Sequence, residues 1–66
     1  MKLIILDFDK SIPYVYTIDE PDQLDMLLNG DDYVEAIMTR NGHRSSNCQW
    51  MVTKNEIIIK QAHKNE

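Results

Sequence analysis

A chain of only 66 residues with a single cysteine, Cys48, has to fold without an internal disulfide, and this limits its architecture more than any other feature. Such a chain has room for one domain, in which apolar burial barely offsets the conformational entropy lost on folding. Hydrophobic residues still make up 42% of the sequence, as in globular and not in disordered chains. We therefore expect one folded domain over residues 1–66, with a frayed polar tail at 61–66, that benefits from a partner.

The longest apolar run in the sequence is Leu3-Ile4-Ile5-Leu6. It is far shorter than the roughly 20 residues needed to cross a bilayer, and acidic residues end it without the small residues of a signal-peptide cleavage site. The sequence therefore predicts no membrane association and a cytoplasmic location.

The first third of the chain reads as a β-hairpin. Residues 2–8 are apolar on both faces, which is typical of a central strand. A short polar turn at 9–11 follows, and apolar residues then alternate with period two over residues 12–18. Pro13 has no N–H to donate, so it belongs at the start or on the open edge of this second strand.

A helix is expected next, over residues 21–29. Asp19 and Pro21 are typical of a helix start, and Gly30 is typical of a helix end. The spacing i, i+3, i+4 gives the helix an apolar stripe that should dock on the sheet, formed by Leu24, Leu27 and Leu28. Trp50, the largest apolar side chain, is expected to be buried against this stripe.

Three more strands are expected, at residues 33–40, 48–53 and 56–60. Asn41-Gly42 is a strong hairpin signal between the first two, although the polar residues 43–47 also permit a longer loop. The predicted class is α+β: a small antiparallel sheet of about five strands with one short helix on one face, in the chain order strand, strand, helix, strand, strand, strand. The order of strands within the sheet stays open.

The segment Leu3-Ile4-Ile5-Leu6-Asp7-Phe8-Asp9-Lys10-Ser11 resembles the first motif of haloacid dehalogenase-type phosphatases. The resemblance implies a phosphoryl-accepting nucleophile at Asp7, a general acid/base at Asp9 and a magnesium ion between carboxylate and phosphate. It covers about nine residues, and the chain is too short for the remaining elements of that fold. We therefore expect no enzymatic activity and no magnesium site at these two residues.

Other motifs favour binding over chemistry. His43 and His63 lie twenty residues apart, and a single cysteine cannot build a cysteine-based zinc site, so no metal or other cofactor is expected. Cys48 is expected to be a buried small hydrophobe. Aromatic side chains with the basic 40–47 hairpin would suit nucleic acid, but a pI of about 4.9 disfavours direct binding to a polyanion.

Charge is unevenly distributed along the chain. Residues 1–35 carry nine acidic and two basic residues, a net charge of −7, whereas residues 36–66 carry five basic and two acidic residues, a net charge of +3. Helix capping does not require so many acids, so we expect a partner-binding surface formed by Asp19, Glu20, Asp22, Asp25, Asp31, Asp32 and Glu35.

Two functions fit this pattern. The first is a small acidic module that docks on a basic surface of a larger protein, as a phage-type inhibitor mimicking the charge of nucleic acid would do. The second is a homodimeric structural or accessory protein that pairs through the edge strand from Glu56 to Lys60.

Overall fold

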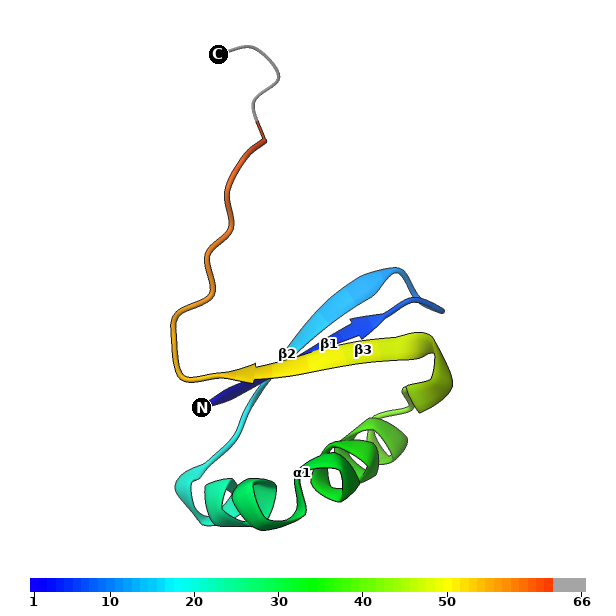
Figure 1. Cartoon of the computed structure of the whole chain (residues 1–66). Coiled ribbons are helices and arrows are strands. Elements are labelled where there is room, and N and C mark those ends of the chain that lie inside the picture. Colours follow the sequence, from blue (N-terminus) through cyan, green and yellow to red (C-terminus); the bar gives the residue numbers. More distant parts are fainter. Residues whose placement is uncertain (63–66) are drawn as a thin grey trace.

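The computed structural model describes residues 1–62 and has two layers, a three-stranded sheet and one helix on one of its faces (Figure 1). All strands are antiparallel and their order in the sheet is β2-β1-β3. The elements in chain order are β1 (Lys2–Asp7), β2 (Ile12–Thr17), α1 (Glu20–Arg40), the 3₁₀ turn η1 (Ser45–Asn47) and β3 (Cys48–Thr53). The α+β class with a helix on one face is confirmed, whereas the sheet of the described residues has three strands instead of about five.

β1 is the central strand, as its apolar run predicts. Its side chains alternate between the two faces, and Leu3, Ile5 and Asp7 lie on the buried face toward α1. Leu3 is paired with Tyr16 and Val52, one residue on each neighbouring strand. The strand with the longest apolar run thus holds both of its neighbours in register.

β1 and β2 form the predicted hairpin. The turn between them includes Ser11 in the left-handed region, with φ of 57°, and the backbone N–H of Lys10 donates to Oδ1 of Asp7 at 3.1 Å. Pro13 lies on β2 opposite Leu6, on an edge strand as expected for a residue without an N–H.

α1 starts where predicted but is more than twice as long. The carbonyl of Asp19 accepts the N–H groups of Asp22 and Gln23, and Pro21 stands in the first turn. Gly30 does not end the helix. Asn29 has a non-helical backbone (φ −127°, ψ 25°), so the chain kinks there and then continues as helix to Arg40.

The prediction of a strand at residues 33–40 is wrong, because the apolar residues of this segment follow the spacing of a helix and not the alternation of a strand. Val34 and Met38 stand one turn apart and are buried, with Ile37 partly buried between them. Together with Leu3, Ile5 and Ile18, the two buried helix residues form the core. The second half of α1, and not the first, therefore holds the helix on the sheet.

The expected packing of Trp50 on the helix leucines is also wrong. The leucine side chains are 62–74% exposed, and Trp50 is 38% exposed. Trp50 instead lines a hollow with Met38 and Glu35, in the second half of α1. The leucine stripe lies before the kink at Asn29, outside the part of α1 that packs on the core.

The last strand of the described chain is β3, with the predicted bounds. No hairpin precedes it: Asn41 and Gly42 close the C-terminal end of α1, where Asn41 N–H donates to the carbonyl of Ile37, and η1 leads into β3. Residues 54–62 form no strand and run away from the sheet (Figure 1), so the strand predicted at 56–60 is not found. Of the predicted tail, residues 63–66 lie outside the described residues.

The second face of the sheet is not covered by any described residue. It carries Ile4, Leu6, Val15 and Met51, the last three of which are 40–56% exposed. Within residues 1–62, α1 is too polar to span a bilayer.

Candidate functional site

A chain of two hydrogen bonds, one buried and one partly buried, lies at the end of β1. Asp7 is 2% exposed because the alternation of β1 turns it toward α1, and His43, in the loop after α1, is 6% exposed. Nδ1 of His43 donates to Oδ2 of Asp7 at 2.7 Å. In the neutral imidazole, Nε2 then accepts a hydrogen bond from the hydroxyl of Tyr16, whose oxygen is 2.6 Å away.

Lys10 completes the surroundings of Asp7. Its Nζ lies 3.8 Å from Oδ2 of Asp7 and donates to the carbonyl of Gly42 at 3.2 Å. The hydrogen bond from His43 lowers the pKa of Asp7, and the backbone N–H and the charge of Lys10 add to this against the opposing effect of burial. Asp7 is therefore held ionised inside the fold.

Two tyrosines enclose His43 from β2. The Tyr14 ring meets the imidazole edge-on, with ring centroids 4.5 Å apart, and the Tyr16 ring does so at 5.9 Å. Burial raises the pKa of Tyr16, and the charges of Tyr14 and Asp7 act in the same direction. These aromatic side chains pack around a histidine and are not free platforms for nucleobases.

The second carboxylate of the phosphatase-like motif has separate partners. Asp9 accepts two hydrogen bonds from the guanidinium of Arg44, at 3.0 and 3.1 Å, and one from Nδ2 of Asn47 at 2.8 Å. The hydrogen bonds from Arg44, followed by that from Asn47, lower the pKa of Asp9. The hydrogen bond to Asp9 and the charge of Asp9 raise the pKa of Arg44. Residues 40–47 were expected to form a basic hairpin. In the structure Arg44 forms an ion pair with Asp9 of the same chain.

Cys48 lies beside the buried network because it pairs with Asp7 across β1 and β3. One ligand atom each of Asp7, His43 and Cys48 lie within 4.8 Å of one another, a donor set that suits zinc. Burial raises the pKa of the Cys48 thiol, and the carboxylates of Asp7 and Asp9 raise it further. Both ring nitrogens of His43 are already engaged, by Asp7 and Tyr16, so a metal would have to replace one of these hydrogen bonds, and the arrangement fits a hydrogen-bond network better than a metal centre.

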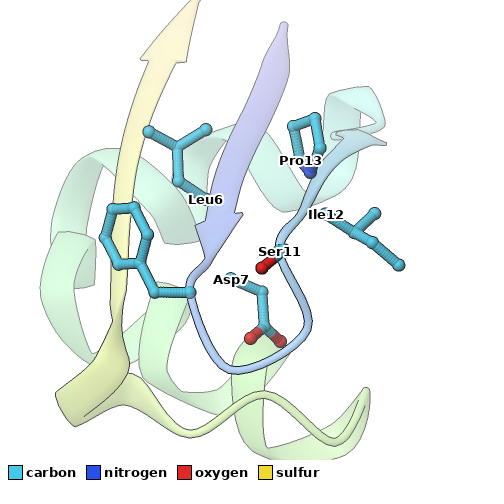
Figure 2. A pocket seen from close by; sticks show the side chains of 6 residues that line it. Leu6, Asp7, Ser11, Ile12 and Pro13 are labelled. Atoms are coloured by element: carbon cyan, nitrogen blue, oxygen red, sulfur yellow. The ribbon is translucent and has the colours of Figure 1, made fainter.

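A hollow of about 310 Å³ opens beside this network, between the ends of β1 and β2 (Figure 2). Leu6, Ile12 and Pro13 give it apolar walls, and Asp7 and Ser11 contribute polar atoms. The carboxylate of Asp7 is turned toward the loop between the strands and away from Leu6 (Figure 2).

The structure distributes the acidic residues predicted for partner binding over three places. Asp22, Asp25 and Asp32 line one groove of α1, while Asp31 and Glu35 line the hollow toward β3. Asp19 and Glu20 stand at the helix N-terminus. All of these side chains are exposed.

The groove along α1 is lined by polar and apolar residues together. It is lined by Asp22, Asp25, Asn29, Asp32, Tyr33, Ala36, Ile37 and Arg40. Nδ2 of Asn29 donates to Oδ1 of Asp25 at 2.6 Å, next to the kink in the helix. Burial raises the pKa of Tyr33, and the charges of Asp22 and Asp25 contribute to this effect.

No family model, curated protein or solved structure matches this chain. The residues themselves therefore carry the functional argument.

Sequence reasoning missed the network of Asp7, His43 and Tyr16. A strand at residues 33–40 followed by a hairpin or loop gives no contact between His43 and the end of the central strand. The signal that would have found it is the helical spacing of Val34, Ile37 and Met38. A helix ending at Arg40 delivers His43 to the end of the central strand. His63, the other histidine, lies outside the described residues.

Proposed function

We propose that this chain is a small protein-binding module whose acidic helix docks on a basic surface of a larger protein. The observation that carries the proposal is the groove along α1, where Asp22, Asp25 and Asp32 lie together and exposed. Arg40 is the one basic residue among those that line it. With three carboxylates and one basic side chain, this surface attracts positively charged groups.

The chemistry of the groove favours arginine or lysine side chains of the partner. Their charged ends can meet the carboxylates, while their aliphatic stems contact Tyr33 and Ile37, which also line the groove. Protein surfaces that bind nucleic-acid phosphates present such side chains. The proposed role is therefore that of an inhibitor of the phage type, which places carboxylates where phosphates would lie.

The two carboxylates of the phosphatase-like motif support binding over hydrolysis. Asp7 is engaged by His43 and Lys10, and Asp9 by Arg44, so each already has a cationic or hydrogen-bonding partner from the chain itself. The groove carboxylates, in contrast, are exposed and have neutral partners: Asp25 accepts a hydrogen bond from Asn29, which leaves its charge uncompensated for a cationic group of a second molecule.

The test is a pull-down from the native host, followed by association kinetics with the captured protein at two ionic strengths. Asp25→Lys should slow association at least several-fold and weaken its dependence on salt, because electrostatic steering acts over about a Debye length, roughly 8 Å at physiological salt. The control, Thr17→Lys with Gln49→Lys, changes net charge equally but on the opposite side of the sheet. An acidic partner, or equal effects of the two variants, would contradict the proposal.

The second candidate function, a homodimeric accessory protein, is favoured by a separate observation. Ile57, Ile58 and Ile59 are 41, 73 and 93% exposed in the segment after β3. Three consecutive isoleucines in an extended segment suit β-pairing with another chain. Sedimentation of the full chain over a range of concentrations tests this candidate directly.

A further inference from the structure

We propose that the segment from Glu56 to Lys60 of one copy binds as an added strand along the outer edge of β3 in a second copy, with its isoleucines against the cleft between α1 and β3. The inference rests on the self-association candidate above and names the surface through which it acts. In a two-fold dimer each copy gives one segment and receives one.

The donated segment is held away from its own sheet. The N–H of Asn55 donates to Oγ1 of Thr53 at 3.0 Å, which fixes a bend directly after β3. Beyond this bend the chain extends away from both layers (Figure 1), and exposure rises along it to 73% at Ile58 and 93% at Ile59. The segment is therefore placed to reach another copy.

The receiving surface is the outer edge of β3. The strand order β2-β1-β3 leaves this edge unpaired within residues 1–62. A cleft of about 450 Å³ lies between the edge and α1 and is lined by Asp31, Glu35, Met38, Ser45, Ser46, Cys48 and Trp50. Trp50, the largest apolar side chain of this lining, is 38% exposed. The cleft thus joins an open strand edge to a partly uncovered apolar side chain.

Side-chain alternation matches the segment to this cleft. On β3, Trp50 and Val52 face α1, and Met51 faces the opposite side. A strand added to this edge with Ile57 and Ile59 toward α1 covers Trp50 and places Ile58 beside Met51. Both apolar faces of the segment are then used.

Charge favours the same pairing. Asp31 and Glu35 line the cleft, and none of its lining residues is basic. The segment carries Lys60 and one acidic residue, Glu56, and Lys54 lies two residues before the segment begins. The flexible lysine stems can reach the carboxylates at the rim.

The test uses two complementary variants of the full chain. Ile57→Ser with Ile59→Ser disables the donated segment, and Trp50→Ser with Glu35→Lys disables the cleft. Native mass spectrometry and sedimentation at micromolar concentrations should show a dimer for the unmodified chain and an at least tenfold weaker dimer for each variant alone. An equimolar mixture should form a heterodimer, because one intact segment then meets one intact cleft. Circular dichroism confirms that each variant is folded.

The outcomes distinguish the outer edge of β3 from the open face of the sheet as the dimer surface. Val15→Ser, on the open face of the sheet, should leave the dimer intact. A dimer that survives the segment variant but not Val15→Ser would overturn this inference and leave self-association standing. A monomeric unmodified chain would overturn both. If that monomer loses stability with the segment variant, the segment folds back on its own β3.

Discussion

His43 joins three parts of the chain that are distant in sequence. Its imidazole bonds to Asp7 on β1 and Tyr16 on β2, and it follows the last turn of α1 directly. Each of these hydrogen bonds contributes to the stability of the fold, because a buried polar atom without a partner is destabilising. The imidazole is therefore a structural link between the helix and the hairpin.

His43→Ala should lower the free energy of unfolding by about 1–3 kcal/mol, because the change removes buried hydrogen bonds and leaves polar atoms without partners. Urea denaturation measures this as a lower midpoint at constant slope. Ser45→Ala, in the exposed turn that follows, should change stability by less than about 0.5 kcal/mol. Equal effects of the two changes would show that the imidazole contributes nothing to the fold.

Asp7 makes the stability of the fold depend on acid pH. Its pKa is lower in the folded chain than the ordinary value of 3.8, so the unfolded chain takes up the proton first as pH falls. The stabilisation is complete above the unfolded pKa and is lost as pH falls through the lower folded pKa. Asp9, whose pKa is also lowered, acts in the same direction.

Asp7→Asn should therefore be less stable than the unmodified chain near pH 7 and should lose less stability as the pH falls below the ordinary carboxyl pKa of 3.8. Urea midpoints at several pH values measure both effects. Asp31→Asn, an exposed change on α1, is the matched control and should follow the unmodified chain. A parallel decline in the Asp7→Asn variant would show that the buried carboxylate does not cause the acid sensitivity.

At the scale of elements, α1 shows why a local pattern can mislead. The alternation of Val34, Ala36 and Met38 fits a strand, and Gly30 followed by two aspartates fits a helix end. Both readings are locally reasonable, but burial selects the helical spacing of Val34 and Met38 against β1. Tertiary packing thus overrides the stop signal, leaving only a kink at Asn29.

The two glycines of the chain should respond to substitution with opposite signs. Gly30 lies inside α1 with no atom within 4 Å of an added Cβ, so Gly30→Ala should stabilise the fold by about 0.5–1 kcal/mol. Gly42 has φ of 78°, in the left-handed region, so Gly42→Ala should be destabilising by about 1–2 kcal/mol. Thermal and urea unfolding measure both. A destabilising Gly30→Ala would show that the kink at Asn29 depends on the glycine.

For the whole molecule, the sequence predicted the class, the hairpin, the bounds of β3 and the start of the helix. It could not predict the sheet order, because several antiparallel arrangements satisfy the same short connections. The buried site was missed with the length of α1, because Asp7, Tyr16 and His43 meet only when the helix continues to Arg40 and returns the chain to β1. The segment at 56–60 was read from its isoleucines alone, without knowing where the sheet edge would lie.

The position of β1 between the other strands also has a consequence for how the chain is made. One neighbour, β2, is synthesised immediately after β1, but the other, β3, is completed only at Thr53. At about 5–20 residues per second, a nascent chain waits roughly 2–7 s between finishing β2 and finishing β3. During that interval one edge of the central strand has no neighbour, and the helix has no finished sheet to cover. We therefore expect β3 to pair with β1 only after the hairpin of β1 and β2 has formed, because that pairing closes a much longer stretch of chain.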